Sequence, residues 1–483
     1  MMEKKLQTIY KSLESLETKM LESEHSMQSL IAGVHPNQVE SAKNFLHYLT
    51  LRTENIADLQ ITLHGFGLSS LASSESHILP QLQAVLMRLG KTYPPNTSLA
   101  NNLHKTNLKE KSAILFGERT TDEPYLMVTI DKSFSFDKEY LQQLMDAGMN
   151  IARINCAHDD EQVWEGMINN LRHASRRAGK ECKIYMDLAG PKIRTAILGK
   201  GKKKGYIKIE EHTEFWLAEN EDQIGKGEIV IGCGISGIIP QLKPDHHILF
   251  DDGALEARVL EVKDNCARLG LLRNSKSNQK LKAEKGINFP NTDLQIEALT
   301  EFDMACLPFI CRHADLIGYS FVKTAEDLEH LQNLLKDQPK VPKIILKIET
   351  PEAVRNLPKL LTQGMKDDVF GVMIARGDLA VEVGFERMSE IQDEILWFCE
   401  AAHVPVIWAT QVLETLQKTG IATRSEITDA AHASMAECVM LNKGDYTLEV
   451  IHTLRDILSR NVTHRNKKAY TMKPLNIAKN FFK

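Results

Sequence analysis

From residue 126 onward, short apolar runs alternate with longer amphipathic segments. Apolar residues at three- and four-residue steps predict helices over 138–147 and 161–178, between neighbouring runs. Strands that alternate with helices at this spacing indicate a parallel sheet or a barrel. Counted from Met127 there are eight such runs, the number of strands that closes a (β/α)8 TIM barrel. The expected strands are 127–130, 150–154, 183–187, 315–319, 343–348, 369–374, 406–409 and 438–441.

Two parts of the chain depart from this alternation. Residues 1–91 repeat an amphipathic pattern, first between Leu6 and Met20, that predicts an all-helical region, and a polar linker with Pro-Pro follows. Residues 196–289 contain short β-type runs separated by turn residues, which predicts an inserted β-rich domain. The expected domains are an N-terminal helical domain with its linker (1–97), a barrel (98–195 and 290–483) and an inserted β-rich lid (196–289).

Charged residues stand where two of the predicted strands end. One run ends in Lys347 and Glu349, and a later one ends in the segment 375–378, which closes on Asp378. Strand, helix and strand form a right-handed parallel crossover, so both ends emerge at the edge where α/β barrels place their chemistry. Glu349 and Asp378 would suit Mg²⁺, and Lys347 would neutralise charge or transfer a proton. A salt-bridge cluster that only caps the barrel is the alternative at this stage.

Composition narrows the class of protein. The net charge of −5 argues against a general nucleic-acid or membrane-surface binder, and no apolar run reaches the ~18 residues of a membrane span. The amino terminus lacks the apolar core of a secretory signal. Eight cysteines without a CxxC pair fit reduced thiols better than disulfides or a zinc site. We therefore expect a cytoplasmic protein of several domains.

One glycine pattern imitates a dinucleotide-binding fingerprint. Gly232, Gly234 and Gly237 have the spacing, but the motif needs a helix to follow, and Pro240 and Pro244 come instead. We therefore expect a turn within the β-rich insert.

Seven motifs, in order along the chain, resemble the pyruvate kinase family over roughly residues 123–460. They are GMNIARINCAH (148–158), DLAGPKIRT (187–195), KGIN (285–288), KIE (347–349), ARGD (375–378), ATQ (409–411) and TRSE (423–426). The resemblance implies a transfer of the phosphoryl group of phosphoenolpyruvate to ADP, giving pyruvate and ATP. Phosphoenolpyruvate and ADP or ATP are thus the expected partners, and Mg²⁺ is the expected cofactor.

The resemblance also implies roles for individual residues. Catalytic residues would be Lys347, which stabilises the phosphoryl oxygens, Arg153, which grips the group in transfer, and Thr410, which helps to relay a proton. Glu349 and Asp378 would hold Mg²⁺. The substrate would be bound by Ala375, Arg376, Gly377, Asp378 and Thr410, and the nucleotide by Asn155, His158, Arg194 and Lys285. The insert would close as a lid and exclude water.

The sequence departs from the family at the potassium site. Potassium-dependent members have an asparagine, a serine, an aspartate and a threonine there, whereas this chain has Asn155, Ala157, Asp187 and Leu188. Lys192 stands where those members have a glutamate, so its ammonium would replace the ion near Asn155 and Asp187, and K⁺ would not be required.

Other differences from the pyruvate kinase family leave alternative functions open. The family's Ser-Gly-Glu-Thr segment after the eighth strand is missing beyond Leu441, its effector domain is expected to be absent, and the helical region is additional. The alternatives are a noncatalytic regulatory relative and a Mg²⁺-dependent enolate lyase or aldolase. The sequence leaves a homo-oligomer open.

Overall fold

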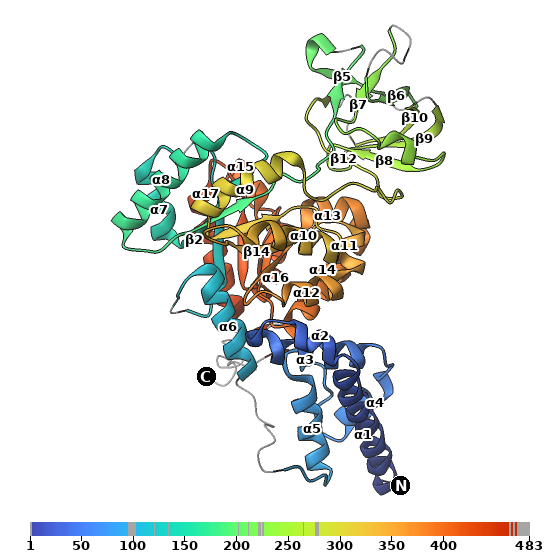
Figure 1. Ribbon diagram of the computed structural model, residues 1–483, viewed down its shortest axis with the longest axis vertical. Helices are drawn as coiled ribbons and strands as arrows, with labels where there is room; N and C mark the ends of the chain where they lie inside the picture. The colour runs from blue at the N-terminus through green and yellow to red at the C-terminus, as the bar shows by residue number, and fades with distance from the viewer. Residues whose placement is uncertain are drawn as a thin grey trace, which may run out of the picture.

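Eight parallel strands close into a barrel in the computed structural model of the chain (Figure 1), which confirms the predicted TIM-barrel fold. Around the barrel the order is β1-β17-β16-β15-β14-β13-β3-β2. The strands are β1 (Tyr125–Thr129), β2 (Met149–Asn155), β3 (Lys183–Asp187), β13 (Leu316–Tyr319), β14 (Lys343–Ile348), β15 (Gly371–Ala375), β16 (Val406–Ala409) and β17 (Cys438–Leu441).

The structure describes most of the chain. The described residues are 2–94, 103–119, 121–133, 135–200, 202–210, 212–220, 224, 227–263, 265–275, 280–462, 465–466 and 469–470. Of the polar linker expected after residue 91, only residues 92–94 are among them. The domain boundaries given above stay predictions.

Helices surround the barrel and join its strands. They are α7 (Lys138–Ala147), α8 (Glu161–Ala178), α9 (Glu301–His313), α10 (Ala325–Lys336), α11 (Pro351–Arg355), α12 (Leu357–Gly364), α13 (Arg376–Val383), α14 (Met388–Ala401), α15 (Glu414–Thr419), α16 (Arg424–His432) and α17 (Thr447–Val462). Thr423 and Glu426 of the TRSE motif form the capping box that begins α16. A short hairpin, β18 (Arg465–Asn466) and β19 (Ala469–Tyr470), follows α17.

The predicted helical region lies at the amino-terminal end of the barrel strands, away from the lid (Figure 1). Its packing on the barrel includes Phe45 and Tyr48, whose rings lie edge-on to Phe398 of α14, and a hydrogen bond from Asn44 to the carbonyl of Ala401. The helices within residues 1–91 are α1 (Met2–Ser26), α2 (Gln28–Gly33), α3 (Val39–Arg52), α4 (Ala57–Gly65) and α5 (Ile78–Arg88). A further helix, α6 (Leu103–Phe116), follows in the segment that was predicted to belong to the barrel.

Helix α6 carries a buried lysine between the helical region and the barrel. The Lys111 ammonium donates to Gln38 Oε1 (2.6 Å) and Ser41 Oγ (2.9 Å), and Ser41 also contacts His403. Burial lowers the pKa of Lys111 to about 7. Neutral hydrogen-bond partners thus surround a cation that is costly to desolvate.

This pKa predicts a pH dependence of folding. Between pH 7 and the ordinary lysine pKa the unfolded chain binds a proton at Lys111 that the folded chain does not, so stability should rise with pH there. Relative to Lys111→Met, the free energy of unfolding of the unmodified protein should therefore increase from pH 7 to pH 9, by at most about 1.4 kcal/mol per pH unit. Denaturant titrations of both proteins at each pH would measure this difference. A difference that stays constant across this range would contradict the prediction.

The β-rich insert lies between β3 and β13 and is confirmed as a lid-like mixed sheet at the carboxyl-terminal end of the barrel strands (Figure 1). Its seven-stranded sheet has the order β12-β8-β9-β10-β6-β7-β4, and β5 pairs with β11 beside it. The strands are β4 (Ala196–Ile197), β5 (Tyr206–Lys208), β6 (Glu214–Ala218), β7 (Val230–Gly232), β8 (His247–Phe250), β9 (Leu255–Lys263), β10 (Cys266–Asn274), β11 (Lys280–Lys282) and β12 (Ile287–Asn288).

Two chain crossings connect the lid to the barrel, and they are hydrogen-bonded to each other. Thr195 N–H donates to Lys285 O, and Glu284 N–H donates back to Thr195 O, each at 2.7 Å. Arg194 and Gly286 form an antiparallel bridge between the same crossings.

Two sequence-based exclusions can be compared with the structure. Gly232 ends β7, Gly234 and Gly237 lie in the turn that follows it, and a 3-10 helix of three residues comes next, so the predicted turn is confirmed. Among the described residues, no helix is long and apolar enough to cross a membrane.

Candidate active site

A buried carboxylate at the end of β3 organises one side of the site. Asp187 is fully buried, and its Oδ2 accepts from Arg153 Nε (2.6 Å) and Nη2 (2.5 Å), on the neighbouring strand β2. Lys347 of β14 lies 3.6 Å from Asp187 Oδ1. Burial opposes the charge on Asp187, but Arg153 and Lys347 outweigh it and hold the pKa of the carboxyl below its usual value. Asp187 therefore brings together the two cations predicted to be catalytic.

Lys347 is nearly buried and has three oxygen neighbours. Its Nζ donates to Ser320 Oγ at 2.7 Å and lies 3.1 Å from Glu349, in addition to Asp187. Burial disfavours its charge, but the two carboxylates overcome this and raise the pKa of the ammonium. Lys347 is therefore a fixed positive charge at the carboxyl-terminal end of the barrel strands.

Glu349 and Asp378 form the candidate metal pair. Glu349 accepts from the backbone N–H of Phe321 at 2.6 Å, and its pKa is raised by burial and by Asp378. A divalent cation would relieve this repulsion, and two carboxylates match the oxygen ligands that Mg²⁺ prefers, so the residues fit the ion. No group of three or more His, Cys, Asp and Glu side chains in the described part of the chain could hold a metal. Water or substrate oxygens would therefore complete the shell.

Thr410 is held at the end of β16 by the segment that follows β15. Its backbone has a φ of +65°, a conformation that costs a β-branched residue energy. The Gly377 N–H donates to Thr410 Oγ1 at 2.7 Å, and the Arg376 guanidinium donates to the carbonyls of Ala409 (3.0 Å) and Thr410 (2.5 Å). Arg376 also binds Asp429 and stacks on Trp408. The predicted substrate segment and Thr410 thus form one hydrogen-bonded unit.

The predicted nucleotide residues lie on β2, on the loop after it and on the lid crossings. Asn155 Oδ1 accepts from the Ala157 N–H at 3.1 Å. The pKa of His158 is lowered by burial and then by Arg194, so these two side chains lie close enough to interact. Arg194 donates to Glu284 O (3.3 Å), and Lys285 pairs with Asp251 at 2.8 Å. Arg194 and Lys285 therefore lie on the two chain crossings that join the barrel to the lid.

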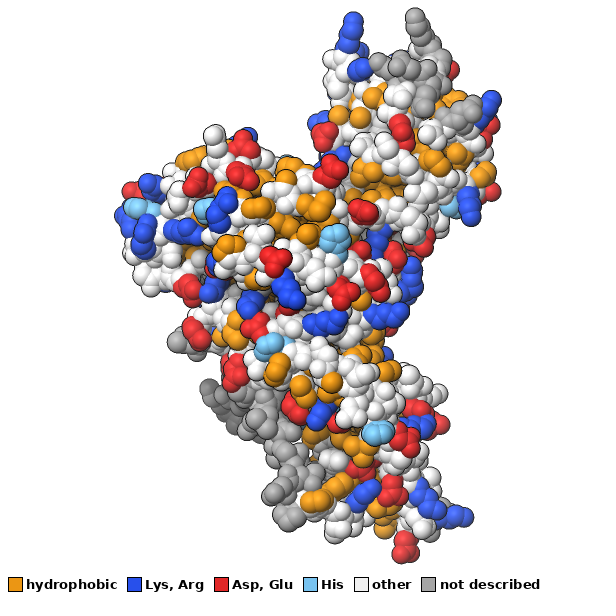
Figure 2. Space-filling model, viewed as in Figure 1, with side chains coloured by type: hydrophobic (Ala, Val, Ile, Leu, Met, Phe, Trp, Pro, Cys, Tyr) orange, Lys and Arg blue, Asp and Glu red, His pale blue; other side chains and the backbone are white. Residues whose placement is uncertain are grey.

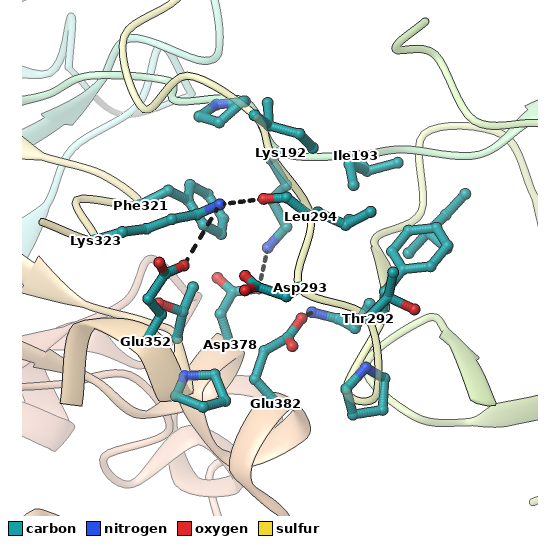
Figure 3. Close-up of a pocket in the computed structure, with 18 of the residues that line it drawn as sticks. Lys192, Ile193, Thr292, Asp293, Leu294, Phe321, Lys323, Glu352, Asp378 and Glu382 are labelled. Carbon is teal, nitrogen blue, oxygen red and sulfur yellow. Dashed lines mark hydrogen bonds and ion pairs between the residues drawn. The ribbon is translucent and has the colours of Figure 1, made fainter. Parts of the chain in front are cut away.

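Lys192 forms an ion pair within the candidate site. Its Nζ lies 2.6 Å from Asp378 Oδ1 (Figure 3), and its expected place near Asn155 and Asp187 stays a prediction. Both oxygens of Asp187 already have donors, since Tyr185 Oη donates to Oδ1 and Arg153 to Oδ2. The ammonium of Lys192 instead pairs with the candidate metal carboxylate.

A cavity of about 300 Å³ opens beside this ion pair, between the lid and the barrel (Figures 2 and 3). Lys192 and Asp378 line it, together with Phe321 and Glu382. Asn288 of the lid donates to Glu382 Oε1 at 2.8 Å across the cavity wall. The cavity therefore reaches Asp378 of the candidate metal pair, whereas Glu349 is not among the residues that line it.

Residues 125–451 match the family described as pyruvate kinase, barrel domain. This match spans more than half of the chain. The chain belongs to the pyruvate kinase family. Curated pyruvate kinases are similar to it along the same region. The protein from Bacillus licheniformis is 33% identical over 339 residues, which are 68% of this chain and 56% of the relative.

Two eukaryotic pyruvate kinases give the same result. The relative from Hypocrea jecorina is 32% identical over 333 residues (66% of this chain, 59% of the relative). The one from Dictyostelium discoideum is 32% identical over 331 residues (67% and 63%). The chain thus spans about three fifths of the length of these pyruvate kinases.

Three contacts of the candidate site were not predicted from the sequence. They are the Ser320 hydroxyl on Lys347, the Phe321 N–H on Glu349, and the Tyr185 hydroxyl on Asp187. Ser320 and Phe321 directly follow β13, so their position after a barrel strand was the available signal. No signal in the sequence distinguished Tyr185 from the other residues of its predicted strand.

Proposed function

We propose that this protein is a Mg²⁺-dependent phosphotransferase that moves the phosphoryl group of phosphoenolpyruvate to ADP, giving pyruvate and ATP. The observation that carries the proposal is the convergence of Arg153 and Lys347 on Asp187, beside the carboxylate pair Glu349 and Asp378. A transfer of this kind needs fixed charges that neutralise an anionic transition state. An enolate lyase has no phosphoryl group that would use both cations.

The chain's own residues would divide the work as follows. Lys347 donates hydrogen bonds to the phosphoryl oxygens as the bond from phosphorus to the enolate oxygen breaks. Arg153 presents its guanidinium to the same oxygens, since its planar fork stays charged. The backbone of 375–378 binds the substrate carboxylate, and Thr410 helps to deliver a proton to the enolate carbon. Mg²⁺, held by Glu349 and Asp378, would supply Lewis-acid stabilisation of the enolate and phosphoryl oxygens.

The lid would control access of water and nucleotide. Arg194 and Lys285 on the two crossings, with Asn155 and His158 on the barrel, would hold ADP so that its terminal phosphate oxygen faces the phosphoryl group. Closure of the lid would exclude water, which would otherwise accept that group.

A coupled assay of pyruvate formation tests the proposal. We expect pyruvate from phosphoenolpyruvate only when ADP and Mg²⁺ are both present, with ATP formed in equal amount. Pyruvate without ADP would contradict phosphoryl transfer. Binding of phosphoenolpyruvate by calorimetry without any turnover would favour the noncatalytic reading.

A second expectation concerns monovalent ions. Asp187 Oδ1 and Oδ2 are occupied by Tyr185 and Arg153, and Ala157 and Leu188 supply no side-chain oxygen for K⁺. The rate should therefore be similar in K⁺ and in tetramethylammonium at equal ionic strength. Lys192→Glu should lower the rate, and K⁺ should not restore it fully. A several-fold activation of the unmodified protein by K⁺ would contradict the expectation.

A further inference from the structure

Tyr185 places a phenol inside the barrel, directly beneath the proposed site. It precedes Asp187 by two residues on β3, so both side chains point to the barrel interior. Its Oη donates to Asp187 Oδ1 at 2.5 Å, and both residues are fully buried. Burial, together with Asp187, raises the pKa of the phenol, so the hydroxyl keeps its proton and remains a donor.

The neighbouring strand leaves room for this hydrogen bond. Gly318 on β13 is the register partner of Asp187. A Cβ at this position would lie 2.0 Å from Tyr185 Oη and 2.2 Å from Asp187 Oδ1. Such distances are far below van der Waals contact, so only glycine at 318 accommodates the tyrosine and the aspartate together.

The phenol also competes with Lys347 for Asp187. Oδ2 is taken by Arg153, and Oδ1 is shared by the neutral phenol, at 2.5 Å, and the Lys347 ammonium, at 3.6 Å. A charge-assisted hydrogen bond is the stronger of the two, so an unoccupied Oδ1 would draw the lysine toward it. With Tyr185 bound there, Lys347 stays 3.6 Å away and lies closer to Ser320 (2.7 Å) and Glu349 (3.1 Å).

We propose that Tyr185 is a positioning residue for phosphoryl transfer, because its hydroxyl occupies Asp187 Oδ1 and so keeps Lys347 directed toward Glu349 and the substrate. Tyr185 acts through Asp187 and does not touch the substrate. The inference rests on the proposed phosphotransferase function. Tyr185 lies in the barrel interior, below the strand ends where the candidate site residues are placed.

The test compares Tyr185→Phe with Tyr319→Phe, measured as kcat and KM for phosphoenolpyruvate. Tyr319 is also fully buried, on the adjacent strand, and its hydroxyl donates to the carbonyl of Asp327 at 3.3 Å, away from Asp187. We expect Tyr185→Phe to lower kcat about tenfold, with a smaller change in KM, and Tyr319→Phe to leave both near their original values. A lower melting temperature with unchanged kcat and KM in Tyr185→Phe would overturn the proposal, because a structural role alone predicts it.

Crystal structures of the unmodified protein and Tyr185→Phe provide a readout that does not need activity. In the variant we expect Lys347 Nζ to approach Asp187 Oδ1 to about 2.8 Å, the ordinary length of a charged hydrogen bond. If Lys347 has the same position in Tyr185→Phe as in the unmodified protein, the positioning role of Tyr185 is overturned, even if the variant is active. If the unmodified protein forms no pyruvate, the proposed function fails, and the displacement of Lys347 still decides whether Tyr185 positions it.

Discussion

Lys347→Met should lower the kcat of phosphoryl transfer at least about 10²- to 10³-fold, while phosphoenolpyruvate still binds. The ammonium lies among Ser320, Asp187 and Glu349. Methionine therefore removes a fixed positive charge from the place where negative charge would develop on the phosphoryl group during transfer. The effect should appear mainly in kcat, because the interaction is strongest in the transition state. Steady-state kinetics and calorimetric binding of phosphoenolpyruvate would measure the two parts separately.

The same strand offers a matched control for this substitution. Lys343 begins β14 at the opposite end of the barrel and pairs with Asp368 at 2.6 Å. Lys343→Met should therefore leave kcat near its original value. Lys347→Met also leaves the buried Glu349 without its paired cation, while Asp187 keeps Arg153, and this should cost about 3–5 kcal/mol of stability, so folding must be checked by circular dichroism. A folded Lys347→Met protein with full turnover would make the lysine a structural partner only.

Glu349→Gln and Asp378→Asn should each lose at least about 10²-fold in kcat/KM, because each removes a charged ligand from the proposed metal pair. Glu349 is buried, and burial and the charge of Asp378 raise its pKa, so we expect a loss of Mg²⁺ affinity when either carboxylate is removed. Kinetics over a range of Mg²⁺ concentrations, with calorimetric titration of the metal, would measure both quantities.

Glu352 supplies the control for the carboxylates. It lines the same cavity and lies 3.9 Å from Lys323, but it has no place in the proposed chemistry. Glu352→Gln should therefore keep its Mg²⁺ affinity and its turnover. Full activity of Glu349→Gln or Asp378→Asn at saturating Mg²⁺ would contradict the proposal that these two carboxylates bind the metal.

The barrel could be predicted closely because its strands are buried on both faces. Continuous apolar runs at 183–187, 343–348, 406–409 and 438–441 have the bounds of β3, β14, β16 and β17. The lid was harder to predict. The sequence predicted β-type runs at 206–209, 213–217, 247–250, 258–262 and 267–271, which correspond to β5, β6, β8, β9 and β10. The strands β4, β7, β11 and β12 were not predicted, because runs of two or three residues carry little periodicity.

The sequence correctly placed Lys347, Glu349 and Asp378 at or just beyond the ends of two barrel strands, β14 and β15, and their roles stay predictions. Contacts between side chains on different strands could not be predicted from the sequence in this way. The salt bridge of Lys192 with Asp378 joins residues far apart in the sequence, and the space for Tyr185 depends on Gly318 of another strand. Such contacts depend on strand order and register, which local spacing does not encode.

The paired crossings at the base of the lid have a mechanical consequence. A single connecting chain allows rotation about several axes, but two crossings that are hydrogen-bonded to each other act as a flat ribbon, soft to bending in one direction and stiff in the other. The lid should therefore swing along one arc, with Arg194 and Lys285 carried on its pivot. In the proposed enzyme, the nucleotide would then enter and the product would leave through the same opening motion of the lid. A change that stiffens the two paired crossings would slow both steps.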